Sequence, residues 1–69
     1  MDPQVGDLVQ TNQKIYTSPI GVQYIPEGTV GIILFHTHTF GGKRFETYFS
    51  IHDQSIFLDE YEFNVLKKA

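Results

Sequence analysis

Short apolar runs separated by turn residues make up most of this chain. The runs are rich in Val, Ile, Phe, Tyr and Thr, the residues that strands favour, and Gly, Pro, Asn and Asp stand between them. No window of about twelve residues shows the 3.6-residue period of an amphipathic helix. The pattern therefore predicts an all-β domain. Its five expected strands cover residues 8–11, 29–40, 43–51, 55–58 and 63–66.

The connections between these strands predict how the sheet is organised. A long irregular loop runs through residues 11–28, and a 3-10 turn at residues 59–61 is expected to join the last two strands. An open sheet of short strands leaves two unpaired edges, and closure into a small barrel removes them. We therefore expect residues 1–69 to form a single small β-barrel domain.

The Gly41-Gly42 pair predicts a tight turn between the second and third strands, because a type I′ turn needs positive φ at both central positions. This turn sets the register of the hairpin and, since side chains alternate, the members of each face. The opposite face is then expected to pair Ile33 with Ser50 and Phe35 with Tyr48. The face assigned to the core consists of Val30, Ile32, Leu34, Phe45, Phe49 and Ile51, continued toward the tip by His36 and His38.

His36 and His38 share this face and are the candidate metal ligands. The chain has no cysteine, so a zinc site would need these imidazoles together with carboxylates or water. His52 is expected about 16 Å away at roughly 3.3 Å per residue, and Glu46 on the other face. We therefore favour a role for His36 and His38 in covering the end of the core. A metal- or pH-responsive hairpin is kept as an alternative, and no cofactor is expected.

The segments VGDLV, IPEGTVGIIL, SIFL and EFNVL carry a resemblance to a known fold. With a long loop after the first and a hairpin after the second, they resemble Src-homology-3-like small barrels, including KOW-type and related bacterial or phage barrels. The resemblance implies a bent first strand before the long loop and a 3-10 turn before the last strand. The chain has no Trp and no ALYDY-like first strand, so recognition of Pro-rich peptides is not carried over. It also lacks the basic loops of KOW ribosomal and transcription proteins.

Composition narrows the classes of function. The chain has no cysteine nucleophile, its serines stand in no recognisable catalytic motif, and 69 residues leave little volume for a water-excluding pocket. We therefore expect no enzymatic activity. The longest apolar run, VGIILF, is far shorter than the roughly 20 residues that cross a bilayer, and the first residues lack a signal-peptide pattern. We expect a soluble, cytoplasmic protein that does not bind membranes.

Nucleic-acid binding is an alternative that the charge disfavours. Eight acidic and five basic residues give a net charge of -3, whereas phosphate binding depends on Lys and Arg. Lys43 and Arg44 nevertheless stand beside Phe40 and Phe45 at the expected hairpin tip, the combination that single-strand binders use. A solvated turn whose charges discourage edge pairing explains the same residues.

Surplus aromatic residues favour a protein-interaction module. Six Phe and four Tyr exceed what we expect one modest core to enclose. Phe35 and Tyr48 would either stabilise the hairpin or offer a platform on its outer face. The resemblance implies that Tyr16 and Tyr24 line a groove with Tyr61, although Tyr24 could instead close the end of the barrel. We predict that these five residues dock the protein onto a larger protein, and we make no prediction of its oligomeric state.

Overall fold

The structure is a computed structural model that describes residues 2–17 and 24–69. Its regular elements in this part of the chain are strands and one 3-10 turn, η1 (Glu60–Glu62), which confirms the predicted all-β class. The strands in chain order are β1 (Leu8–Thr11), β2 (Ile15–Tyr16), β3 (Tyr24–Ile25), β4 (Val30–Thr39), β5 (Gly42–Phe49), β6 (Gln54–Asp59) and β7 (Phe63–Lys67).

Five of these strands are the predicted ones, with ends that differ by two residues at most. The 3-10 turn begins one residue later than predicted, and the backbone N–H of Asp59 donates to Glu62 Oε1 at 2.7 Å across it. In the stretch predicted as an irregular loop, of which residues 18–23 lie outside the described residues, β2 pairs with β3 in a short ladder. Strands of two residues are too short to give an alternating pattern, and for this reason the sequence did not reveal them.

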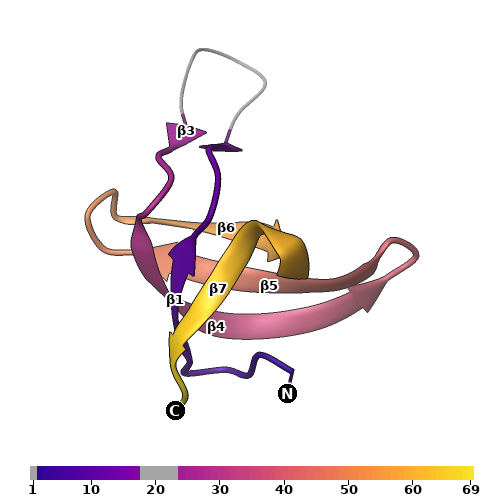
Figure 1. The fold of residues 1–69 in the computed structure, drawn as a ribbon. Helices are drawn as coiled ribbons and strands as arrows, with labels where there is room; N and C mark the ends of the chain where they lie inside the picture. Colours follow the sequence, from indigo (N-terminus) through magenta and orange to yellow (C-terminus); the bar gives the residue numbers. More distant parts are fainter. Residues whose placement is uncertain (1, 18–23) are drawn as a thin grey trace.

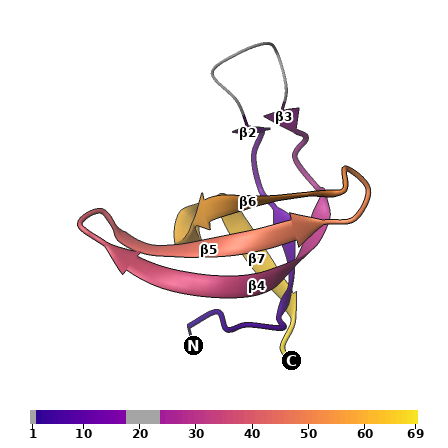
Figure 2. The same ribbon diagram turned by 180° about the vertical axis from the view of Figure 1, so that it is seen from behind.

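The five longer strands form one antiparallel sheet in the order β6-β5-β4-β1-β7. The long β4–β5 hairpin curves, and its tip extends to one side of the molecule, while β2 and β3 extend in another direction (Figures 1 and 2). No ladder joins β6 to β7 within residues 2–17 and 24–69. The sheet is therefore open in its pairing, and the predicted barrel remains a prediction.

The core lies on one face of this sheet, and the small ladder closes one end of it. Phe45 and Phe63 meet edge to face with their ring centroids 5.6 Å apart, a favoured aromatic geometry. Gly31 is packed so closely that a Cβ there would lie 2.8 Å from Thr47 Cγ2. The buried apolar side chains are Val9, Ile15, Ile25, Ile33, Phe45, Phe49, Leu58 and Phe63.

The predicted position of the β4–β5 turn is wrong by one residue. Gly42 has a φ of +113° and pairs with Thr39, so Phe40 and Gly41 form the turn. The side chain of Thr39 explains this choice, because its Oγ1 accepts from the Gly41 N–H at 3.2 Å and donates to Gly42 O at 3.0 Å. His36 therefore stands opposite Phe45, and not opposite Thr47 as predicted. This shift moves partners by two residues and leaves the faces unchanged.

A bulge in β4 does change the faces. The register shifts between Ile33 and Phe35, where Ile33 pairs with Thr47 and Phe35 with Glu46. As a result Ile33, predicted to face outward, is 1% exposed, while Ile32, predicted to be buried, is 38% exposed. An extra residue in one strand of an antiparallel pair reverses the inward and outward positions beyond it. The predicted core residues Val30, Ile32 and Leu34 are accordingly exposed, whereas Phe45 and Phe49 are buried as predicted. Ile51, also predicted in the core, is exposed for another reason: β5 ends at Phe49, and Ile51 lies in the turn that follows.

Candidate functional site

The side of the sheet opposite the core is lined with exposed apolar residues. Leu8, Ile32 and Tyr48 form one row across β1, β4 and β5, since Leu8 pairs with Ile32 and Ile32 with Tyr48. A second row runs from β4 to β6. We call the apolar side chains of this side the outer apolar face; each is 37–54% exposed, and they are Leu8, Val30, Ile32, Leu34, Phe35 and Phe57.

The sequence of β4 explains why this face exists. Val30 to Phe35 read VGIILF, so apolar side chains fall on both sides of the strand. Such continuous apolar runs are typical of strands whose two faces are both covered. Here the core covers one side, with Ile33 buried, and the described part of the chain leaves the other side exposed to solvent.

The second row consists of Phe35, Glu46 and Phe57, in which Glu46 pairs with Phe35 on one side and with Phe57 on the other. A carboxylate therefore stands between two exposed aromatic rings. Ser55 Oγ donates to Glu46 Oε2 at 2.9 Å. Within residues 2–17 and 24–69, the other oxygen, Oε1, receives no hydrogen bond, and Glu46 makes no ion pair.

Phe35 and Tyr48 share the outer side of the hairpin, as predicted, but they are not directly opposite each other. Tyr48 stands opposite Ile32 and is half-buried, and its hydroxyl donates to Asp53 Oδ1 at 2.8 Å. This hydrogen bond raises the pKa of the Tyr48 phenol above its ordinary value. Tyr48 is thus fixed by its own chain, whereas Phe35 is available for an external contact.

Of the three tyrosines predicted to line a groove, the structure brings two together. Tyr16 and Tyr24 pair across the β2–β3 ladder with ring centroids 6.5 Å apart, and Lys14 Nζ lies 4.5 Å from the centroid of Tyr24. Tyr61 lies on η1, which is tied to the start of the loop because Asn12 Nδ2 donates to Tyr61 O at 2.9 Å. In the described parts of the chain, no ring contact joins Tyr61 to the other two tyrosines.

The two basic residues of the hairpin do not form one patch. Lys43 and Arg44 are neighbours on β5, so their side chains leave opposite faces of the sheet. Lys43 Nζ forms an ion pair with Asp2, and Arg44 Nε lies 3.6 Å from Asp59 Oδ1. Each cation therefore has a carboxylate of the same chain beside it, which weakens the nucleic-acid alternative.

The two histidines of β4 lie close together on the exposed part of the core face. The ring centroids of His36 and His38 are 6.5 Å apart, and the His36 ring also lies 6.1 Å from Phe45. His52 is in the turn at the other end of β5. No group of three or more His, Cys, Asp or Glu side chains that could hold a metal ion occurs in the described residues.

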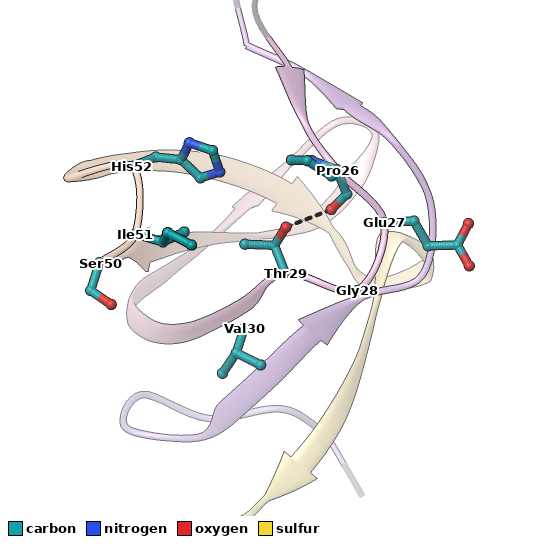
Figure 3. Close-up of a pocket in the computed structure, with 8 residues that line it drawn as sticks. All are labelled: Pro26, Glu27, Gly28, Thr29, Val30, Ser50, Ile51 and His52. Atoms are coloured by element: carbon teal, nitrogen blue, oxygen red, sulfur yellow. Dashed lines mark hydrogen bonds between the residues drawn. The ribbon is translucent and has the colours of Figure 1, made fainter.

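A surface depression of about 500 Å³ lies between the segment before β4 and the turn after β5. Figure 3 shows His52 and Ile51 on one side of it and Pro26 and Thr29 on the other, where Thr29 Oγ1 donates to Pro26 O at 2.7 Å. No sequence motif marks this depression, and the hairpin pattern predicts Ile51 in the core. Its lining mixes polar and apolar residues.

Asp7 is a buried carboxylate with a structural role. It accepts hydrogen bonds from Lys68 Nζ at 2.7 Å and from the N–H groups of Ala69 and Gln4, both at 2.9 Å. The bond from Lys68 is the main cause that lowers its pKa to about 2. Its oxygens are occupied by the chain itself, so Asp7 ties β1 to the last residues of the chain.

No protein-family model, curated protein or solved structure matches this chain. In the part of the chain that the structure describes, no helix has the length and apolar character needed to span a membrane. The function is therefore inferred from the surface of the molecule.

Proposed function

We propose that this protein is a non-catalytic interaction module that docks onto a larger protein through its outer apolar face. The observation that carries the proposal is β4, a strand with apolar side chains on both sides and a core on only one of them. Strands of this composition normally lie in sheets covered on both faces. A bound protein would supply the second cover.

The extent of the outer apolar face supports the same conclusion. At roughly 150–200 Å² for a large side chain, six side chains about two fifths exposed present roughly 400 Å² of apolar surface. The largest apolar patch of a typical monomer is about 300–600 Å² and is often functional. The outer apolar face is therefore large enough to form the centre of an interface.

The charge distribution favours a partner with a basic surface. The three ion pairs of the described residues use three of the five basic and three of the eight acidic residues. Five carboxylates are then left against two ammonium groups, those of Lys14 and Lys67. Opposite charges across an interface speed association and suppress wrong partners.

A Src-homology-3-like architecture is part of this proposal. A four-residue first strand followed by a long connection to β4, and a 3-10 turn directly before β7, support it. Strands β4, β5 and β6 form an antiparallel meander. The pairing of β1 with β7 brings the first and last strands together. A bacterial or phage origin is proposed from the resemblance alone, and a cytoplasmic location from the shortness of the longest apolar run, VGIILF.

Selection of binders from a random peptide library, displayed against the immobilised protein, tests the proposal. Phe35→Ser removes a central ring of the outer apolar face, and Phe40→Ser, at the fully exposed hairpin tip, is the matched control. We expect the selected peptides to lose at least tenfold in affinity for Phe35→Ser and less than twofold for Phe40→Ser. Peptides that respond equally to both variants, or a library that yields no binder, would refute the proposal.

A further inference from the structure

We infer that the Phe35–Glu46–Phe57 row is a binding site for a lysine or arginine side chain of the partner, set within the outer apolar face. This inference rests on the proposed function, because it names the chemistry that the partner must present. It starts from the carboxylate of Glu46, which lies between two exposed aromatic residues, Phe35 on β4 and Phe57 on β6.

Binding of a partner to the outer apolar face would bury Glu46. A protein that covers Phe35 and Phe57 also covers Glu46, which lies between them. A carboxylate taken out of water must be hydrogen-bonded and paired with a cation, since a buried unpaired charge is strongly unfavourable. Ser55 satisfies Oε2, while Oε1 has no donor from the described residues. The missing donor must come from the partner.

The chain's own cation on this side, Arg44, lies at the edge of the row, where it is paired with Asp59 and not with Glu46. Arg44 is two residues from Glu46 on the same side of β5. Its Nη2 donates to Phe57 O at 3.3 Å, and its Nε lies near Asp59. Arg44 is thus drawn toward the edge strand β6, and it forms no ion pair with Glu46.

The spacing of the strands leaves room for a cation between the two aromatic residues. Neighbouring strands lie about 4.8 Å apart, so residues on β4 and β6 that flank the same β5 position are separated by roughly 10 Å. A cation above Glu46 is then flanked by the backbone positions of Phe35 and Phe57, each about 5 Å to one side, so that either ring can turn its face toward the cation within the roughly 6 Å over which a ring attracts one. Arginine fits best, because its planar guanidinium both stacks on rings and donates two parallel hydrogen bonds to a carboxylate.

The cation site and the apolar residues beside it together define the partner segment that would bind. A basic side chain would bind Phe35, Glu46 and Phe57, and neighbouring apolar side chains would cover Ile32 and Leu34. The segment therefore carries Arg or Lys next to large apolar residues. A second copy of this chain, the other candidate occupant of the outer apolar face, would have to bring its own Glu46 into the same interface.

The test uses the peptides selected from the random library and synthetic versions in which each Arg is replaced by citrulline, its neutral isostere. Each Arg peptide and its citrulline version are titrated against the wild-type protein and against Glu46→Gln. The amide oxygen of this variant can still accept the hydrogen bond from Ser55. We expect enrichment of Arg or Lys beside apolar residues. Citrulline should weaken binding about tenfold in the wild type and less than twofold in Glu46→Gln, which a double-mutant cycle reads as coupling between the two groups.

Each other outcome overturns the inference in a distinguishable way. Peptides that lose affinity for Phe35→Ser, but show no basic enrichment or the same citrulline effect in both proteins, would refute the cation site and leave the proposed function intact. Peptides whose affinity changes for neither Phe35→Ser nor Glu46→Gln would overturn the cation site and the proposed function together. Sedimentation that shows a dimer broken by Phe35→Ser would assign the outer apolar face to a second copy and also overturn the cation site.

Discussion

Ile32 and Ile33 are chemically identical neighbours on β4 that the structure assigns to opposite faces. Ile33 lies in the core, and Ile32 belongs to the outer apolar face. Replacement of each by alanine removes the same three carbon atoms from two different environments. The pair therefore tests the bulge on which the outer apolar face depends.

The size of the difference follows from burial. For Ile33→Ala, three buried carbons at about 0.8 kcal/mol each give about 2.4 kcal/mol, and the cavity they leave raises the loss to about 3–4 kcal/mol. Ile32 is 38% exposed, so Ile32→Ala forfeits part of that transfer term and leaves no enclosed cavity. We expect a loss of about 1.5 kcal/mol at this position, about three fifths of the transfer free energy of the three carbons.

Urea denaturation followed by circular dichroism measures both variants against the wild type. A domain of this size has roughly 3–10 kcal/mol of total stability, so Ile33→Ala should unfold at a far lower urea concentration than Ile32→Ala. At about 4–8 °C per kcal/mol for a small domain, its melting temperature should fall by well over 10 °C. Equal losses, or a larger loss for Ile32→Ala, would contradict the bulge and with it the outer apolar face.

Two further predictions concern the close packing and the buried carboxylate. Gly31→Ala brings a Cβ within 2.8 Å of Thr47 Cγ2, so overpacking should cost about 1–3 kcal/mol in urea unfolding; Gly41→Ala, with its nearest atom at 3.8 Å, is the control and should change stability little. The folded-state pKa of Asp7, about 2, lies below its ordinary 3.8. Its contribution is therefore complete above about pH 4 and is lost as the pH falls through 2. Urea unfolding between pH 5 and pH 2 should show this loss, and Asp7→Asn should be less stable at pH 5 and respond less to acid; an unchanged acid response in the variant would contradict the assignment.

The sequence predicted the longer strands well, because turn residues and β-favouring residues separate them clearly. It failed inside VGIILF, where no alternation exists to set which residues face the core. The bulge within that run depends on tertiary packing, because Gly31 and Ile33 fit the core side against Thr47 and Phe49. The turn was misplaced because the hydrogen bonds of the Thr39 side chain, and not the glycine pair alone, determine its position.

The site was predicted in part for the same reasons. Phe35 was expected on the outer side of the hairpin, and its exposure agrees with that expectation. Phe57 and Glu46 were missed because their meeting depends on the pairing of β5 with β6, and the sequence does not fix that register. Glu46 lies in a strand expected to have a polar outer side, so nothing in the sequence marks this carboxylate as part of a binding site.

The measurement that tests the central claim most directly is an NMR footprint of a selected peptide on the 15N-labelled protein. The outer apolar face predicts shifts of amides on β4, β5 and β6, centred on Ile32, Phe35 and Phe57, with little change at Tyr16 and Tyr24. A footprint confined to the β2–β3 ladder, or to the depression beside Ile51, would contradict the proposed docking surface.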